Sequence, residues 1–94
     1  MPREKFSEAI EKRIKIVEDL LNGMLQDRSV PRNIKRVAQK GINMLYEGES
    51  DATAGILASN VMYLVDDLSQ DPNIPFAART TLYRIISILE TIKD

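Results

Sequence analysis

The 94-residue sequence contains neither cysteine nor histidine. Without cysteine the chain has no disulfides and no thiolate metal sites, an absence that fits a cytoplasmic protein. Without histidine it lacks the commonest general base and the commonest transition-metal ligand. We therefore expect no metal and no cofactor.

The sequence also lacks a large excess of either charge, and it lacks long hydrophobic runs. Its net charge is −1, so the chain as a whole does not attract nucleic acid or anionic lipid. Apolar runs are short and interrupted by charge, whereas a membrane span needs about 20 apolar residues. Met-Pro-Arg-Glu-Lys at the N-terminus is not followed by an apolar segment, so we expect neither a secretory signal nor a membrane partner.

What the sequence does contain is a repeat. Residues 20–31 are echoed by residues 64–75, with Asp27 matching Asp71 and Pro31 matching Pro75 at one constant offset. A repeat of this length is typical of one helical hairpin used twice. The chain is too short for two independent cores. We therefore predict a single domain, 1–94, made of one hairpin at about 4–47 and another at about 51–93.

The spacing of apolar residues predicts helices throughout, because they recur at helical intervals and no segment alternates with period two. The expected helices cover about 4–26, about 31–47, about 52–69, and the segment from Pro75 onward. Each proline sits where a first helical turn tolerates it. Gly48 is expected to end the second helix, and Ser50 or Asp51 to cap the third. The repeat also places Gly23 inside the first helix rather than at its end.

Four amphipathic helices joined by short loops can pack in two ways. They can close into one up-and-down bundle, or two hairpins can stack side by side as in a helical solenoid. Solenoids generally need at least three units to bury a continuous core. The sequence therefore favours an all-α, four-helix up-and-down bundle made of two related helical hairpins.

The expected second helix carries a one-sided positive charge. Its cations lie within about 140° of arc, and no acidic residue interrupts them between Asp27 and Glu47. The four cations are Arg32, Lys35, Arg36 and Lys40. They could bind RNA, another polyanion or an acidic protein groove, and Tyr46 could stack on a base. The simpler interpretation is a solvated face whose cations pair with acids on a neighbouring helix.

The expected third helix is unusual for the opposite reason. No charged residue occurs from Ala52 to Val65, although 29% of the chain is charged. Ile56, Asn60 and Tyr63 lie on a flank that a four-helix bundle would expose. An exposed uncharged flank is typical of an interface, so we predict self-association or a protein partner here. The alternative is a centrally placed helix that is simply uncharged.

Arg13 is a third anomaly, because it lies among apolar positions of the first helix. An arginine there must either extend past the edge of the core or find an acidic partner. Asp66 and Asp67 are the candidate partners. Either outcome is structural rather than catalytic.

Catalysis has little support in the sequence. There is no Glu-x-x-His motif, no glycine-rich phosphate loop and no Ser-His-Asp set. We therefore predict a non-catalytic helical interaction module, not an enzyme. Weak binding of RNA or another polyanion by the second helix is the alternative.

Two proline-containing runs carry a family resemblance. Residues 30–36, and residues 69–75 with the following Ala78-Arg79-Thr80, resemble the archaeal proteins of uncharacterised protein family 0147. The resemblance covers most of the chain. It implies a compact four-helix fold in a cytoplasmic archaeal protein. It implies no activity, and no functional residues are carried over from it.

Overall fold

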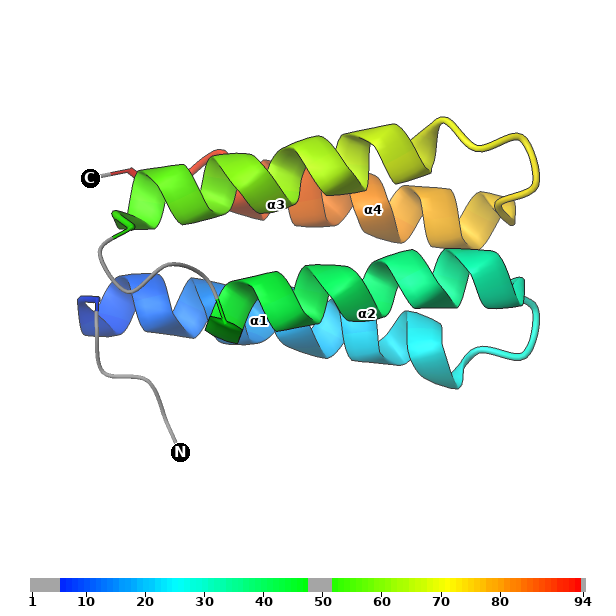
Figure 1. Ribbon diagram of the computed structural model, residues 1–94, viewed down its shortest axis with the longest axis horizontal. Coiled ribbons are helices and arrows are strands. Elements are labelled where there is room, and N and C mark those ends of the chain that lie inside the picture. The colour runs from blue at the N-terminus through cyan, green and yellow to red at the C-terminus, as the bar shows by residue number, and fades with distance from the viewer. Residues whose placement is uncertain (1–5, 48–51, 94) are drawn as a thin grey trace.

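The computed structural model describes residues 6–47 and 52–93, and every regular element in those two ranges is a helix. The helices are α1 (Glu8–Gln26), α2 (Arg32–Glu47), α3 (Ala54–Ser69) and α4 (Phe76–Leu89). Consecutive helices run in opposite directions and are joined by short connections (Figure 1). The predicted all-α class is confirmed.

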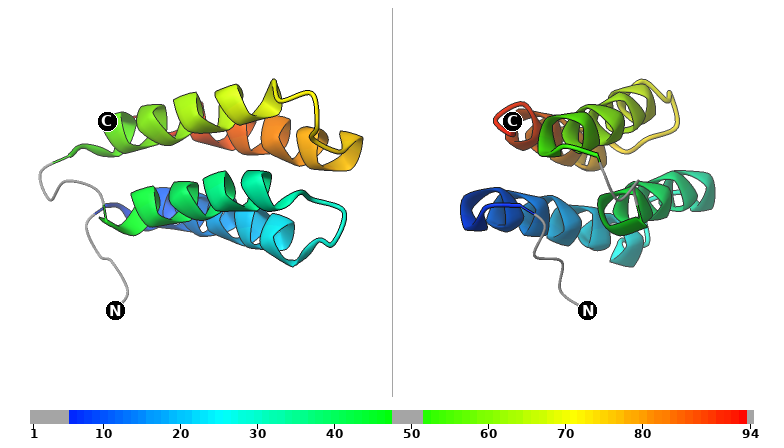
Figure 2. Two further views of the ribbon diagram at one scale, coloured as in Figure 1. Left: turned by 45° about the vertical axis from the view of Figure 1, so that its right-hand side comes forward. Right: turned by 60° about the vertical axis from the view of Figure 1, so that its left-hand side comes forward.

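The four helices close into a bundle. Each helix packs on the next one along the chain, and α1 also packs on α4. The pairs α1–α2 and α3–α4 form two layers that lie face to face (Figures 1 and 2). In this arrangement α3 lies diagonally opposite α1, and α4 lies diagonally opposite α2. The chain therefore adopts the closed up-and-down packing that the sequence favours.

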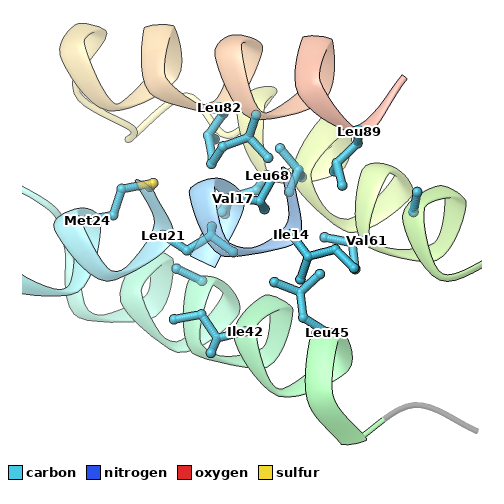
Figure 3. Close-up of a cluster of buried hydrophobic side chains, with 14 of the residues drawn as sticks. Ile14, Val17, Leu21, Met24, Ile42, Leu45, Val61, Leu68, Leu82 and Leu89 are labelled. Carbon is cyan, nitrogen blue, oxygen red and sulfur yellow. The ribbon is translucent and has the colours of Figure 1, made fainter. Parts of the chain in front are cut away.

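The core runs the length of the bundle between the two layers, and all four helices contribute to it (Figure 3). Its fully buried side chains are all aliphatic. The largest of them are Ile14, Leu21, Ile34, Leu45, Leu82, Ile85 and Leu89. Burial of a side chain of this size is worth about 1.5–3 kcal/mol, so this core is a large favourable contribution to folding.

Two helix starts differ from the sequence-based expectation. Helix α1 begins at Glu8 rather than near residue 4, because the Ser7 hydroxyl accepts the Ile10 N–H and caps it there. Helix α3 begins after Thr53, whose hydroxyl accepts the Ile56 N–H at 3.2 Å. The cap is therefore Thr53 rather than Ser50 or Asp51. These two residues and Gly48 lie outside the described residues.

The two hairpin turns share their hydrogen bonds. In each turn the aspartate carboxylate accepts an N–H from two residues ahead, from Ser29 to Asp27 and from Asn73 to Asp71, both at 2.8 Å. In each turn the aspartate carbonyl also accepts the N–H of a buried aliphatic residue, at 3.2 Å in both cases. Short polar side chains thus hold each turn closed while an apolar residue anchors it to the core.

Candidate interaction surfaces

The outer side of α3 is uncharged along most of its length and carries two large, exposed hydrophobic side chains. Ile56 is 52% exposed and Tyr63 is 78% exposed, and Asn60 is exposed between them. By contrast, Ala54 and Ala58 of the same helix are buried. The structure thus places all three residues of the predicted self-association flank on the surface. We call Ile56, Asn60 and Tyr63 the α3 flank.

A groove runs beside the α3 flank, between α3 and α4. It consists of two adjoining hollows of about 600 Å³ and 350 Å³. Ser59, Met62 and Glu90 line both hollows, so the two form one continuous channel. Sequence reasoning missed the contribution of α4 to this groove. The lack of charge on α3 signals its own side, but no pattern within α4 reveals which helix α4 packs against.

Helix α4 adds exposed aromatic rings that the sequence analysis did not single out. Phe76 is 82% exposed at the start of the helix, and Tyr83 is exposed two turns later. Arg79 of α4 is half-buried. It donates hydrogen bonds to the carbonyls of Ser69 at 2.9 Å and Asp71 at 3.1 Å. This guanidinium therefore closes the C-terminal end of α3.

The four cations of α2 lie on the opposite layer from α3. Arg32, Arg36 and Lys40 are exposed, and Lys35 is half-buried. None of the four forms an ion pair with another residue in the described parts of the chain. We call this set the α2 basic face. Arg32, Arg36 and Lys40 follow one line along the helix at steps of about 6 Å.

The two lysines of α1 behave differently, because each pairs with an acid about one turn away. Lys12 pairs with Glu8 at 3.4 Å. Lys15 pairs with Glu18 and with Asp19, each at 3.2 Å. These contacts raise the pKa of Lys15, and the largest cause is its hydrogen bond to the Glu18 carboxylate. Such exposed pairs add little to stability, because water and salt screen them. Pairing of this kind is what the α2 basic face lacks.

Tyr46 makes a contact between two helices. Its hydroxyl donates a hydrogen bond of 2.7 Å to the Glu18 carboxylate, which links α2 to α1. The ring therefore lies toward α1 instead of standing free beside the cations. The other exposed rings, Tyr63, Phe76 and Tyr83, lie on α3 and α4. The structure thus places no freely exposed aromatic side chain of the described residues on the α2 basic face.

Arg13 is exposed, so its side chain extends past the core edge rather than entering it. No ion pair joins it to Asp66 or Asp67 among the residues that the structure describes. The reason is topological: α3 lies diagonally opposite α1, and the neighbours of α1 are α2 and α4.

Within residues 6–47 and 52–93 there is neither a cluster of metal-binding side chains nor a membrane-spanning helix. No group of three or more acidic side chains in these ranges could hold a metal ion. No helix in the same ranges is long and apolar enough to cross a membrane. The surfaces that remain as candidate sites are the α3 flank with its groove and the α2 basic face.

Comparisons with known proteins identify a family. A family model described as "Uncharacterised protein family (UPF0147)" matches residues 1–92. The UPF0147 protein of Desulfurococcus amylolyticus is 44% identical over 75 residues, which cover 80% of this chain and 80% of that protein. The UPF0147 protein of Methanothermobacter thermautotrophicus is 41% identical over 78 residues, which cover 83% of this chain and 74% of that protein.

The fold is also shared with solved structures. A crystal structure from the same family, from Thermoplasma acidophilum, superposes with a TM-score of 0.78 at 34% identity. That match covers 93% of this chain and all of the other. A second crystal structure, of a protein of unknown function, has a TM-score of 0.81 at 33% identity and covers 98% of this chain and all of the other.

Proposed function

The chain belongs to the uncharacterised protein family UPF0147, and we propose that it is a non-catalytic helical interaction module that pairs with a second copy through the α3 flank. The observation that carries the proposal is the exposure of Ile56 and Tyr63 on a helix side without charge. Exposed apolar surface beside a groove is typical of a protein interface. The family name assigns no activity that competes with this proposal.

Charge favours a second copy as the partner. A two-fold symmetric interface places the same surface patch on both subunits, so a patch of one sign would repel itself. The α2 basic face has this defect, because all four of its charged residues are positive. The α3 flank does not, because no charged residue occurs from Ala52 to Val65. Among the surfaces described, the α3 flank is thus the one best suited to contact its own copy.

The proposal is tested by measuring molecular mass by sedimentation equilibrium over a dilution series. We expect the wild-type mass to approach twice 10.7 kDa at high concentration. Ile56→Glu and Tyr63→Glu place a charge in the interface and should leave a monomer, with helix content by circular dichroism unchanged. Ile16→Glu is the matched control, because Ile16 is 45% exposed on α1 in the other layer. A wild-type chain that stays monomeric at every concentration would overturn the proposal.

A second candidate function is weak polyanion binding by the α2 basic face. The observation in its favour is the contrast with α1, whose lysines are paired with acids while those of α2 are not. Unpaired cations in a line can follow a phosphate backbone, and their release of counterions makes affinity fall with salt. Association through an apolar flank tolerates salt, so ionic strength separates the two functions.

The polyanion candidate is tested by fluorescence anisotropy with labelled single-stranded RNA at several salt concentrations. Replacing Arg32, Lys35, Arg36 and Lys40 by alanine should abolish binding. Each lost phosphate contact should also reduce the slope of log affinity against log salt by about 0.7. The control replaces Lys12, Arg13 and Lys15 of α1 by alanine. Equal binding by the two variants would rule out the α2 basic face as the site.

A further inference from the structure

The groove between α3 and α4 has a direction. One hollow extends to Gly55 and Lys93, and the other extends to Tyr63 and Asp66. Helix α4 runs antiparallel to α3 (Figure 1). Lys93 therefore lines the hollow at the start of α3, together with Gly55, while Asp66 lies near the end of α3. Gly55 and Asp66 are separated by about 16 Å along the helix axis. The groove thus has two distinct ends.

The two ends carry opposite charges that are free to pair. Lys93 and Asp66 are exposed, and neither forms an ion pair within the described part of the chain. The Asp66 carboxylate accepts one long hydrogen bond, 3.3 Å, from the Gln70 side chain, which leaves acceptor positions open. Arg79 is not an alternative cation for this site, because it is bound to the carbonyls of Ser69 and Asp71.

Two copies can meet groove to groove with their α3 helices parallel or antiparallel. The parallel arrangement places Asp66 opposite Asp66 of the partner subunit, and Lys93 opposite Lys93 of the partner subunit. The antiparallel arrangement places Asp66 opposite Lys93 of the partner subunit at one end and repeats that contact at the other. Glu90 lines both hollows, so each copy brings one acid to the middle of the groove in either arrangement. This single like-charge contact weakens both arrangements alike and does not discriminate between them.

We propose that two copies pair with their α3 helices antiparallel. Asp66 of each copy then forms an ion pair with Lys93 of the partner subunit, one pair at each end of the groove. This inference rests on the proposed function and adds its orientation. The apolar flank supplies the contact, and the charges at the groove ends select one orientation. Charged groups at the edge of an interface typically act in this way, giving register and specificity more than affinity.

The test is an exchange of charge between the two ends. Asp66→Lys places a cation opposite Lys93 of the partner subunit at both ends, and Lys93→Glu places two acids opposite each other in the same way. Each variant alone should associate about tenfold more weakly than the wild type. An equimolar mixture of the two variants restores both ion pairs, so it should form a heterodimer about as tightly as the wild type pairs with itself.

Asp67→Lys is the matched control. It makes the same charge change on the adjacent exposed residue, which does not line either hollow, and it should associate as the wild type does. If Asp66→Lys and Lys93→Glu associate no more weakly than Asp67→Lys, or if mixing them restores nothing, the antiparallel pairing is wrong although the dimer stands. A wild-type chain that stays monomeric overturns the proposed function and this inference together.

Discussion

At the scale of single residues, Asp27 shows how this small domain uses its polar side chains. The Ser29 hydroxyl donates a hydrogen bond of 2.7 Å to the Asp27 carboxylate, and the Ser29 N–H donates another of 2.8 Å. These bonds, with a smaller contribution from Lys35, hold the pKa of Asp27 below its ordinary value of 3.8. The hydrogen bonds of the first turn thus favour the charged form of the Asp27 carboxylate.

Removing the hydroxyl should therefore raise that pKa. We expect Ser29→Ala to move the pKa of Asp27 toward 3.8, because the largest cause of the shift is lost. Since the folded-state pKa is the lower one, the stabilisation by Asp27 is complete above its unfolded value and disappears as the pH falls through the folded value. Carboxyl-carbon NMR titration measures the shift, with the exposed Ser87→Ala as control. An unchanged pKa in Ser29→Ala would contradict this account.

At the scale of elements, the glycines of α1 and α2 lie in different surroundings. A Cβ added at Gly23 of α1 meets nothing within 4 Å. A Cβ added at Gly41 of α2 comes to 3.4 Å from side-chain atoms of both Leu21 and Leu64. Gly41 thus lies where α2 packs closely on its two neighbours, whereas Gly23 costs helix stability without a packing reason.

This contrast predicts different responses to the same substitution. Gly23→Ala should raise the free energy of unfolding by about 1 kcal/mol, which is the helix-propensity difference between the two residues. Gly41→Ala gains the same propensity, but its methyl group meets two leucine side chains at the close limit of van der Waals contact. Small shifts of both leucines should therefore make its net gain smaller than that of Gly23→Ala. Urea denaturation of the two variants decides the matter. Equal stabilisation would show that the α2 packing is looser than described.

At the scale of the whole molecule, the two layers depend on one shared core. Ile85 of α4 is fully buried in it, whereas Ile16 of α1 is 45% exposed. We expect Ile85→Ala to lower the free energy of unfolding by about 2–5 kcal/mol, because it leaves a cavity between the layers. Ile16→Ala, the same chemical change, should cost far less. Thermal and urea unfolding followed by circular dichroism measure both, and similar losses would contradict the assigned core.

Some elements of this fold could be predicted from sequence because their causes are local. The positions after Pro31 and Pro75 start helices since proline suits a first turn, and α2 and α4 do begin directly after them. Gly23 could be kept inside α1 because the matching stretch of α3 continues as helix. The starts of α1 and α3 were less predictable, since several polar residues compete for the capping position and the structure selects Ser7 and Thr53.

The surface features also differ in whether they could be predicted from sequence. The exposure of Ile56, Asn60 and Tyr63 and the cluster of cations on α2 were predictable from helical periodicity, which assigns each residue to a face of its own helix. Their functional roles remain proposals. The groove was not predictable, because Lys93 and Asp66 become its two ends only when α3 and α4 lie side by side.

The amino-acid sequence by itself determined the four helices, the sides on which their apolar residues lie and the absence of cysteine and histidine chemistry. Only the tertiary structure decided which helices are neighbours, that Arg13 is exposed and lies diagonally away from Asp66 and Asp67, and that Arg79 turns inward. The physical reason is that helix formation depends on residues within a few turns of each other. Neighbour relations depend instead on how four apolar faces close around one core.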